Sequence, residues 1–218
     1  MKRRWDKLRK RWRRDGAWAV LRRGGTLAVA RYIYAEKCYY FVRLDTSREI
    51  KTLRKRLAKT EFRLLTPEEV VSISYARGRR KKRDFAAFMD SKCRCFAIIC
   101  DRTVIAHVFA AAQSQKEKVT GYVMDADDRR LFLLDATTAP EFRGRGVAIE
   151  LLIELTRHAR REGVKEFVAF VDEADKRARR TWKRIGFEPY GKLRHRRLFG
   201  GLLKFNTVIE WDAVHDPF

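Results

Sequence analysis

From residue 61 onward, short apolar runs alternate with segments whose apolar residues recur every three or four positions. Short runs bounded by Gly, Pro and polar residues predict strands, whereas the longer spacing predicts amphipathic helices. The runs that predict strands cover residues 62–65, 93–100, 103–112, 131–137, 164–171, 187–193 and 203–211. Because residues 164–171 are apolar on both faces, we expect them to form a central, buried strand.

Four helices are predicted in the same part of the chain. One begins at Thr66, because Thr as the N-cap is followed by Pro at the first helical position and Glu at the third. A short helix follows around residues 85–89. The apolar residues between 148 and 159 fall on one helical face, and Gly163 ends that helix. The last helix carries its apolar face over residues 178–185.

The first 60 residues follow another pattern. In residues 1–14, Trp5, Leu8 and Trp12 share one helical face and Lys and Arg fill most other positions. Residues 28–34 and 38–44 are rich in Val, Tyr, Ile and Phe, and with Ala35-Glu36-Lys37 between them they predict a hairpin with a turn at 35–37. A basic linker helix is expected over 46–59. We therefore expect an N-terminal extension over residues 1–60 and a domain over residues 61–218.

Charge strengthens this division, because the formal net charge of +23 is concentrated in the extension. Residues 1–60 hold 20 of the 51 Lys and Arg but only 5 of the 28 Asp and Glu. Through residues 1–23 this basic helix can bind an anionic membrane surface or an acidic protein, and less favourably nucleic acid. Alternatively, its tryptophans pack on the protein's own core and its charges are only solvated.

Composition limits the class of protein. A chain with 45% hydrophobic and 12% aromatic residues is not wholly disordered, and no apolar run approaches the roughly 18 residues that cross a bilayer. No secretory signal peptide is recognisable. Four cysteines, Cys38, Cys93, Cys95 and Cys100, are spaced neither as a disulfide framework nor as zinc ligands. We expect a cytoplasmic protein, with peripheral membrane association left open, and no metal site.

One loop has the sequence features of an anion-binding site. The residues between Thr138 and the helix near Ala148 read Ala-Pro-Glu-Phe-Arg-Gly-Arg-Gly-Val, a glycine-rich turn that leads into a helix N-terminus. Free N–H groups and the helix dipole make such a turn an anion site, and glycine lets a phosphate approach the backbone. Neither the Walker pattern nor the full dinucleotide fingerprint is present. Taken alone, the loop is also compatible with an ordinary turn with solvated arginines.

The surrounding sequence resembles the GCN5-related N-acetyltransferase (GNAT) superfamily over about residues 61–212. Its motif [Q/R]-x-x-G-x-[G/A] is matched by Arg143, Gly146 and Ala148, and the family's second helix ends in Gly-Phe, as at Gly186-Phe187 here. The resemblance implies an α/β (α+β) fold: a mixed, mostly antiparallel sheet flanked by helices, here with the basic extension added. It also implies that acetyl-CoA is the cofactor.

In this resemblance, backbone N–H groups of the loop hold the coenzyme A pyrophosphate, and an N–H near Thr137 or Thr138 meets the thioester carbonyl. The family often has Asn at the start of its last helix, near the coenzyme arm, and this chain has Asp175. The cofactor-binding residues expected from the resemblance are Thr137, Thr138, Arg143, Gly144, Arg145, Gly146, Val147, Ala148 and Asp175.

The catalytic residues depart from the family pattern. Trp182 stands where a Tyr often protonates the leaving thiolate, and its indole has no proton to give at neutral pH. Tyr190 is our substitute acid, although it can be an ordinary half-buried strand residue. Asp135 is our general base, although it can simply face solvent, and His107 is a second candidate or a core histidine. His158 and His195 are expected to be exposed.

Together these features predict an N-acetyltransferase that moves an acetyl group from acetyl-CoA to a primary amine, most simply of a small molecule. The resemblance implies that the transfer is direct, without a covalent acyl-enzyme. A variant would use a longer acyl group, carried on coenzyme A or on an acidic acyl carrier protein. The alternative from another class is a binding module that keeps the fold, catalyses nothing and is recruited to membrane or nucleic acid by its basic N-terminus.

Overall fold

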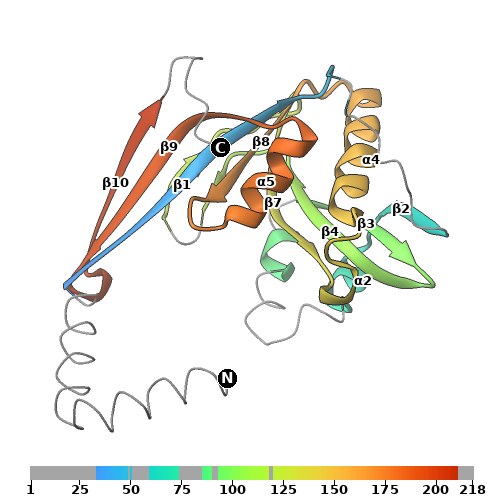
Figure 1. Ribbon diagram of the computed structural model, residues 1–218, viewed down its shortest axis with the longest axis horizontal. Helices are drawn as coiled ribbons and strands as arrows, with labels where there is room; N and C mark the ends of the chain where they lie inside the picture. Colours follow the sequence, from blue (N-terminus) through green and yellow to red (C-terminus); the bar gives the residue numbers. More distant parts are fainter. Residues whose placement is uncertain are drawn as a thin grey trace, which may run out of the picture. The chain divides into compact units, whose positions relative to one another are not determined.

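The computed structural model describes residues 33–48, 50, 59–73, 85–89, 93–117 and 120–210 (Figure 1). Internal contacts divide the chain into two units: a larger one of residues 38–193 and 208–218, and a smaller one of residues 1–37 and 194–207. The predicted helix at 1–14 and most of the predicted linker helix lie outside the described residues. The site discussed below lies wholly in the larger unit.

Eight of the described strands form one sheet in the order β10-β9-β1-β8-β7-β4-β3-β2. Their bounds are β1 Tyr34–Asp45, β2 Thr60–Leu64, β3 Arg94–Cys100, β4 Thr103–Ala111, β7 Arg130–Thr138, β8 Glu166–Asp172, β9 Glu188–Leu198 and β10 Leu203–Glu210. The pairs β1/β8, β2/β3, β3/β4 and β4/β7 are antiparallel, and β7/β8 is parallel. Two short strands, β5 Gln115–Lys116 and β6 Val123–Met124, form a separate ribbon. The mixed, largely antiparallel sheet confirms the predicted fold class.

The helices cover both faces of this sheet. On one face lie α4 (Val147–Arg161) and α5 (Lys176–Ile185), and their buried residues share a core with Phe96 and Ile98 of β3. On the other face, the buried residues of α2 (Pro67–Val71) and of the helical segment 85–89 share a second core with the alternate β3 residues Cys95 and Ala97. This alternation follows from the period of two along a strand.

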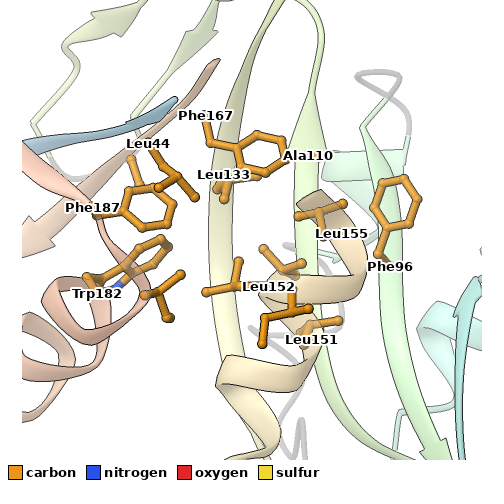
Figure 2. Packing of buried hydrophobic residues seen from close by; sticks show 14 of the residues in the cluster. Leu44, Phe96, Ala110, Leu133, Leu151, Leu152, Leu155, Phe167, Trp182 and Phe187 are labelled. Carbon is orange, nitrogen blue, oxygen red and sulfur yellow. The ribbon is translucent and has the colours of Figure 1, made fainter. Parts of the chain in front are cut away.

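The packing of α4 and α5 fixes the position of the site. Leu151, Leu152 and Leu155 of α4 point toward the strands, and Trp182 of α5 packs against Phe187 with ring centroids 4.4 Å apart, edge to face (Figure 2). Each such fully buried side chain contributes about 1.5–3 kcal/mol of hydrophobic stabilisation. The ends of both helices are therefore held firmly relative to β7 and β8.

Most predicted elements are confirmed within a few residues, including the capping box at Thr66, whose hydroxyl accepts from the Glu69 N–H. The predicted hairpin is wrong, since residues 35–37 form no turn but lie within β1. A partner far along the chain contacts this stretch: Nε of Arg196 lies 3.0 Å from Oε2 of Glu36. The division of the chain at residue 60 stays a prediction.

The exposure predicted for His195 is also wrong, because its side chain is only 1% exposed. Strand β9 continues beyond its predicted end at Leu193. Because side chains alternate along a strand, Leu193 and His195 both lie on the buried side of β9. Nδ1 of His195 lies 2.8 Å from Oδ1 of Asn206. His158 is half-buried rather than exposed.

Candidate functional site

Strands β7 and β8 separate at the end of the sheet that carries the site. Their parallel pairing runs from Arg130 opposite Glu166 to Leu133 opposite Ala169, and the remaining residues of the two strands are not paired with each other. On its other side, β7 pairs with β4 through a register shift between His107 and Phe109. Asp135 lies at this irregularity with a φ of 43°, which is strained for a residue with a Cβ.

The glycine-rich loop forms the N-terminal end of α4. Gly144 and Gly146 have φ values of 80° and 85°, in the left-handed region that favours glycine. Gly146 is the N-cap of α4, and no side chain caps the helix there. Arg143 is held by a hydrogen bond of 3.0 Å from its Nε to the carbonyl oxygen of Thr138. The uncapped N–H groups, the helix dipole and this arginine together make the loop suited to an anion.

A cleft of about 870 Å³ lies between the end of β7, this loop, α4 and α5. It is lined by Ala136, Thr137, Thr138, Phe142, Arg143, Gly144, Gly146, Val147, Ala148, Ile149, Leu151, Leu152, Asp175, Lys176, Arg177, Ala178, Arg180, Thr181, Trp182 and Arg184. Of the nine predicted cofactor-binding residues, only Arg145 is not part of this lining. Its guanidinium lies over the Phe142 ring instead, 5.6 Å from the centroid.

Sequence reasoning missed the basic residues of α5 that line the cleft. The helix reads Lys-Arg-Ala-Arg-Arg-Thr-Trp-Lys-Arg-Ile, and its apolar face was the only pattern used to predict it. The signal was present, because Arg177, Arg180 and Arg184 fall at i, i+3 and i+7 and therefore on one side of the helix.

Asp175 begins α5 as its N-cap, as its residue type favours. Its Oδ1 atom accepts hydrogen bonds from the backbone N–H groups of Arg177 and Ala178, at 3.1 and 2.9 Å. This carboxylate therefore holds the first turn of α5 at the edge of the cleft. Its predicted contact with the coenzyme arm stays a prediction.

The two predicted base candidates lie together on the other face of the sheet. Asp135 accepts a hydrogen bond of 3.1 Å from Thr137 Oγ1, and its Oδ2 atom lies 3.8 Å from Nε2 of His107. His107 is fully buried beside Phe85, with ring centroids 5.1 Å apart. Burial, with a smaller effect of the Asp135 charge, raises the pKa of the nearby Cys95 thiol to about 12. Thr137 also lines the cleft and therefore connects this pair to it.

Tyr190, the predicted acid, is not brought to the cleft. It stacks on Phe41 with ring centroids 5.7 Å apart, and its hydroxyl donates to Sδ of Met124 at 3.7 Å. Burial raises the pKa of Tyr190 to about 12. Trp182, at the position where the family often has Tyr, is only 9% exposed and belongs to the core beneath α5.

Within the described ranges, no three His, Cys, Asp or Glu side chains gather closely enough to hold a metal ion. Nor does any helix in this part of the chain have the length and apolar character needed to cross a bilayer.

Comparison with known proteins gives one family match. The family model described as "Acetyltransferase (GNAT) family" matches residues 59–187, more than half of the chain. The matched segment contains β7, the loop, α4 and α5, that is, every element that lines the cleft. No curated protein matches the chain significantly.

Solved structures share the fold at low sequence identity. A conserved protein of unknown function from Staphylococcus epidermidis is 12% identical, with a TM-score of 0.56 over 84% of this chain and 65% of that one. A GCN5-related N-acetyltransferase from Sphaerobacter thermophilus is 14% identical, with a TM-score of 0.54 over 80% of this chain and 56% of that one. A GCN5-related glucosamine N-acetyltransferase region of a fungal multi-domain β-N-acetylglucosaminidase is 15% identical, with a TM-score of 0.54 over 79% and 22%. The chain spans less than two thirds of the length of each of these proteins.

Proposed function

The chain belongs to the acetyltransferase (GNAT) family, and we propose that it moves an acetyl group from acetyl-CoA to a primary amine by direct attack. The observation that carries this proposal is the cationic cleft at the N-terminus of α4. The loop that lines it contains two glycines with left-handed backbone conformation. A cofactor with a pyrophosphate fits this loop. Side chains at Gly144 or Gly146 would strain the backbone, and Arg143 and Arg177 supply positive charge.

We assign separate roles in the proposed reaction to the residues around the gap between β7 and β8. When bound, acetyl-CoA supplies the activated acyl group. A backbone N–H near Thr137 or Thr138 would stabilise the negative charge that develops on the carbonyl oxygen during attack. Asp135 would take the proton that the amine loses as the new C–N bond forms and the C–S bond breaks. Its place on the face away from the cleft would let the amine approach from the side opposite the donor.

No dedicated acid is required for the leaving group. A thiol has an ordinary pKa near 8.5, so a thiolate leaves readily compared with an alkoxide. Trp182 cannot donate a proton, and Tyr190 lies in an aromatic cluster outside the cleft lining. The acid role of Tyr190 therefore stays a prediction that mutagenesis must decide.

We propose a small-molecule amine, such as an amino sugar or an amino acid derivative, as the acceptor. One solved structure with the same fold carries a glucosamine N-acetyltransferase region in its name, which gives a reason to test amino sugars first. A longer acyl group on coenzyme A or on a carrier protein is the donor variant. A binding module without catalysis is the second candidate function, because the common Tyr is replaced by Trp182.

The test is acetyl transfer by the full chain. Purified protein is incubated with acetyl-CoA and single amines from a panel of amino sugars, amino acids and polyamines. Free thiol release is followed, and the product is identified by mass. We expect thiol release that depends on one class of amine, with a product heavier by one acetyl group. Coenzyme A binding without transfer to any amine would favour the binding module instead.

A further inference from the structure

The cleft carries more positive charge than a pyrophosphate requires. Five cationic side chains line it, from Arg143, Lys176, Arg177, Arg180 and Arg184. The only carboxylate in the lining is Asp175, which already accepts two hydrogen bonds as the N-cap of α5. A concave surface with this excess of cations favours a ligand with more than one phosphate group.

These cations form two groups along the cleft. Arg177 reaches the loop, since a Cβ built on Gly144 would lie 3.9 Å from its Nη2 atom. Arg180 and Arg184 continue the same side of α5 by one and two further turns, which places Arg184 about 10 Å along the helix axis from Arg177. Arg177 therefore belongs with Arg143 to the proposed pyrophosphate site at the loop. Arg180 and Arg184 form the second group, which lies farther from the loop.

Arg180 and Arg184 are available for a ligand. Both are exposed, and neither forms an ion pair with any carboxylate that the structure describes. The opposite side of α5, with Trp182 and Ile185, is buried in the core, so the helix cannot turn the two arginines away from the cleft. The packing of the helix therefore keeps both arginines on the side that lines the cleft.

We infer that Arg180 and Arg184 form a second anion site that binds the 3′-phosphate of the coenzyme, an inference that rests on the proposed function. Coenzyme A carries this phosphomonoester on the ribose next to the pyrophosphate, with a charge of about −1.5 to −2 at pH 7. The phosphopantetheine arm of an acyl carrier protein has a single phosphodiester and no such group. The two arginines thus select a free nucleotide donor over a carrier protein.

The test compares coenzyme A with 3′-dephospho-coenzyme A by calorimetry on the full chain. We expect the wild-type protein to bind coenzyme A about 10-fold to 100-fold more tightly, the size of a charge-assisted contact. In Arg180→Gln/Arg184→Gln, the affinity for coenzyme A should fall to that for the dephospho form, and the affinity for the dephospho form should stay within about twofold. Lys183→Gln removes a charge from the same helix outside the cleft lining and should preserve the preference.

The outcomes separate this inference from the proposed function. Equal wild-type affinity for the two ligands would overturn the second anion site and leave the coenzyme site intact. Equal weakening of both ligands in the arginine variant would also overturn it, because general electrostatic attraction would then explain the result. Binding of neither ligand to the wild-type protein would overturn both proposals.

Discussion

Nε2 of His107 lies 3.8 Å from Oδ2 of Asp135, on the face of the sheet away from the cationic cleft. The histidine side chain is fully buried, whereas 30% of the aspartate side-chain surface is exposed to solvent. The contact depends on the register shift between β4 and β7 and on the left-handed backbone of Asp135. It places a carboxylate beside the part of β7 that is not paired with β8, where the proposed mechanism requires a group that accepts the proton of the amine.

We predict that Asp135→Asn slows turnover about 10²-fold, which is the usual size of general-base assistance. The acidic limb of the pH–rate profile should flatten as well, since the amide does not titrate. Tyr190→Phe serves as the comparison, because Tyr190 lies outside the cleft lining. Three superimposable profiles for the wild type and the two variants would exclude both side chains from proton transfer.

We predict that Gly146→Asp abolishes most coenzyme A binding, with an affinity at least about 100-fold weaker. The substitution strains a residue at φ 85° and places a negative charge at the N-terminus of α4, where phosphate should bind. Gly163→Asp is the matched control, because Gly163 has a φ of 80° with open space around it at the other end of α4. Calorimetry should show unchanged binding for the control. Affinity of Gly146→Asp within about threefold of the wild type would exclude the loop as the coenzyme site.

We predict that Trp182→Phe retains most of the turnover and costs about 1–2 kcal/mol of stability. The indole packs edge to face on Phe187 in the core beneath α5, so the smaller ring leaves part of this contact unmade. Urea unfolding measures the loss of stability, and steady-state kinetics measure the turnover rate. If a variant that remains folded turned over slower by about two orders of magnitude, Trp182 would take part in the reaction.

The raised pKa of Cys95 predicts a stability change at high pH. Its thiol ionises near pH 9.0 in an unfolded chain, but the folded pKa is about 12. Ionisation therefore favours the unfolded state between these values, and the contribution of Cys95 to stability falls by up to about 1.4 kcal/mol per pH unit. We expect the destabilisation of Cys95→Ala relative to the wild type to shrink as pH rises above 9. A difference that stays constant up to pH 11 would contradict the buried, protonated thiol.

Residues 1–23, which lie outside the described residues, are predicted from their sequence to bind a partner rather than to take part in the chemistry. Their removal should leave activity on a small amine largely intact. It should weaken binding to anionic vesicles, and that binding should decline as salt screens the charges. Vesicles of zwitterionic lipid and a short duplex DNA are the comparison probes. A folded truncation without acetyl transfer would show instead that the segment helps to build the acceptor site.

Local patterns predicted the elements whose interactions are local. The capping box at Thr66 and the glycine turn before α4 need only neighbouring residues, and both are observed. The continuation of β1 through residues 35–37 was not predictable in this way. Glu36 interacts there with Arg194 and Arg196, about 160 positions away in the sequence, and such partners override a polar turn signal.

Prediction of the site from the sequence was limited in the same way, because it too depends on contacts between distant segments. Eight of the nine cofactor-binding residues inferred from the family motif line one cleft, because the motif encodes a loop of fixed conformation. The place of the α5 arginines in the cleft lining was not predicted, since exposed arginines in a sequence are usually solvated. Only the packing of Trp182 and Ile185 shows which way the charged side of this helix faces.

The charges of α5 also link folding to the ligand. Lys176 and Arg180, and Arg180 and Arg184, are like charges four residues apart, and each such pair destabilises an isolated helix by about 0.2–0.5 kcal/mol. A bound polyanion would neutralise this repulsion, and the relief would form part of its binding free energy, so such a ligand would stabilise the folded protein by mass action. The melting temperature would then rise with the concentration of such a ligand, and the protein would be most vulnerable to unfolding when that ligand is scarce.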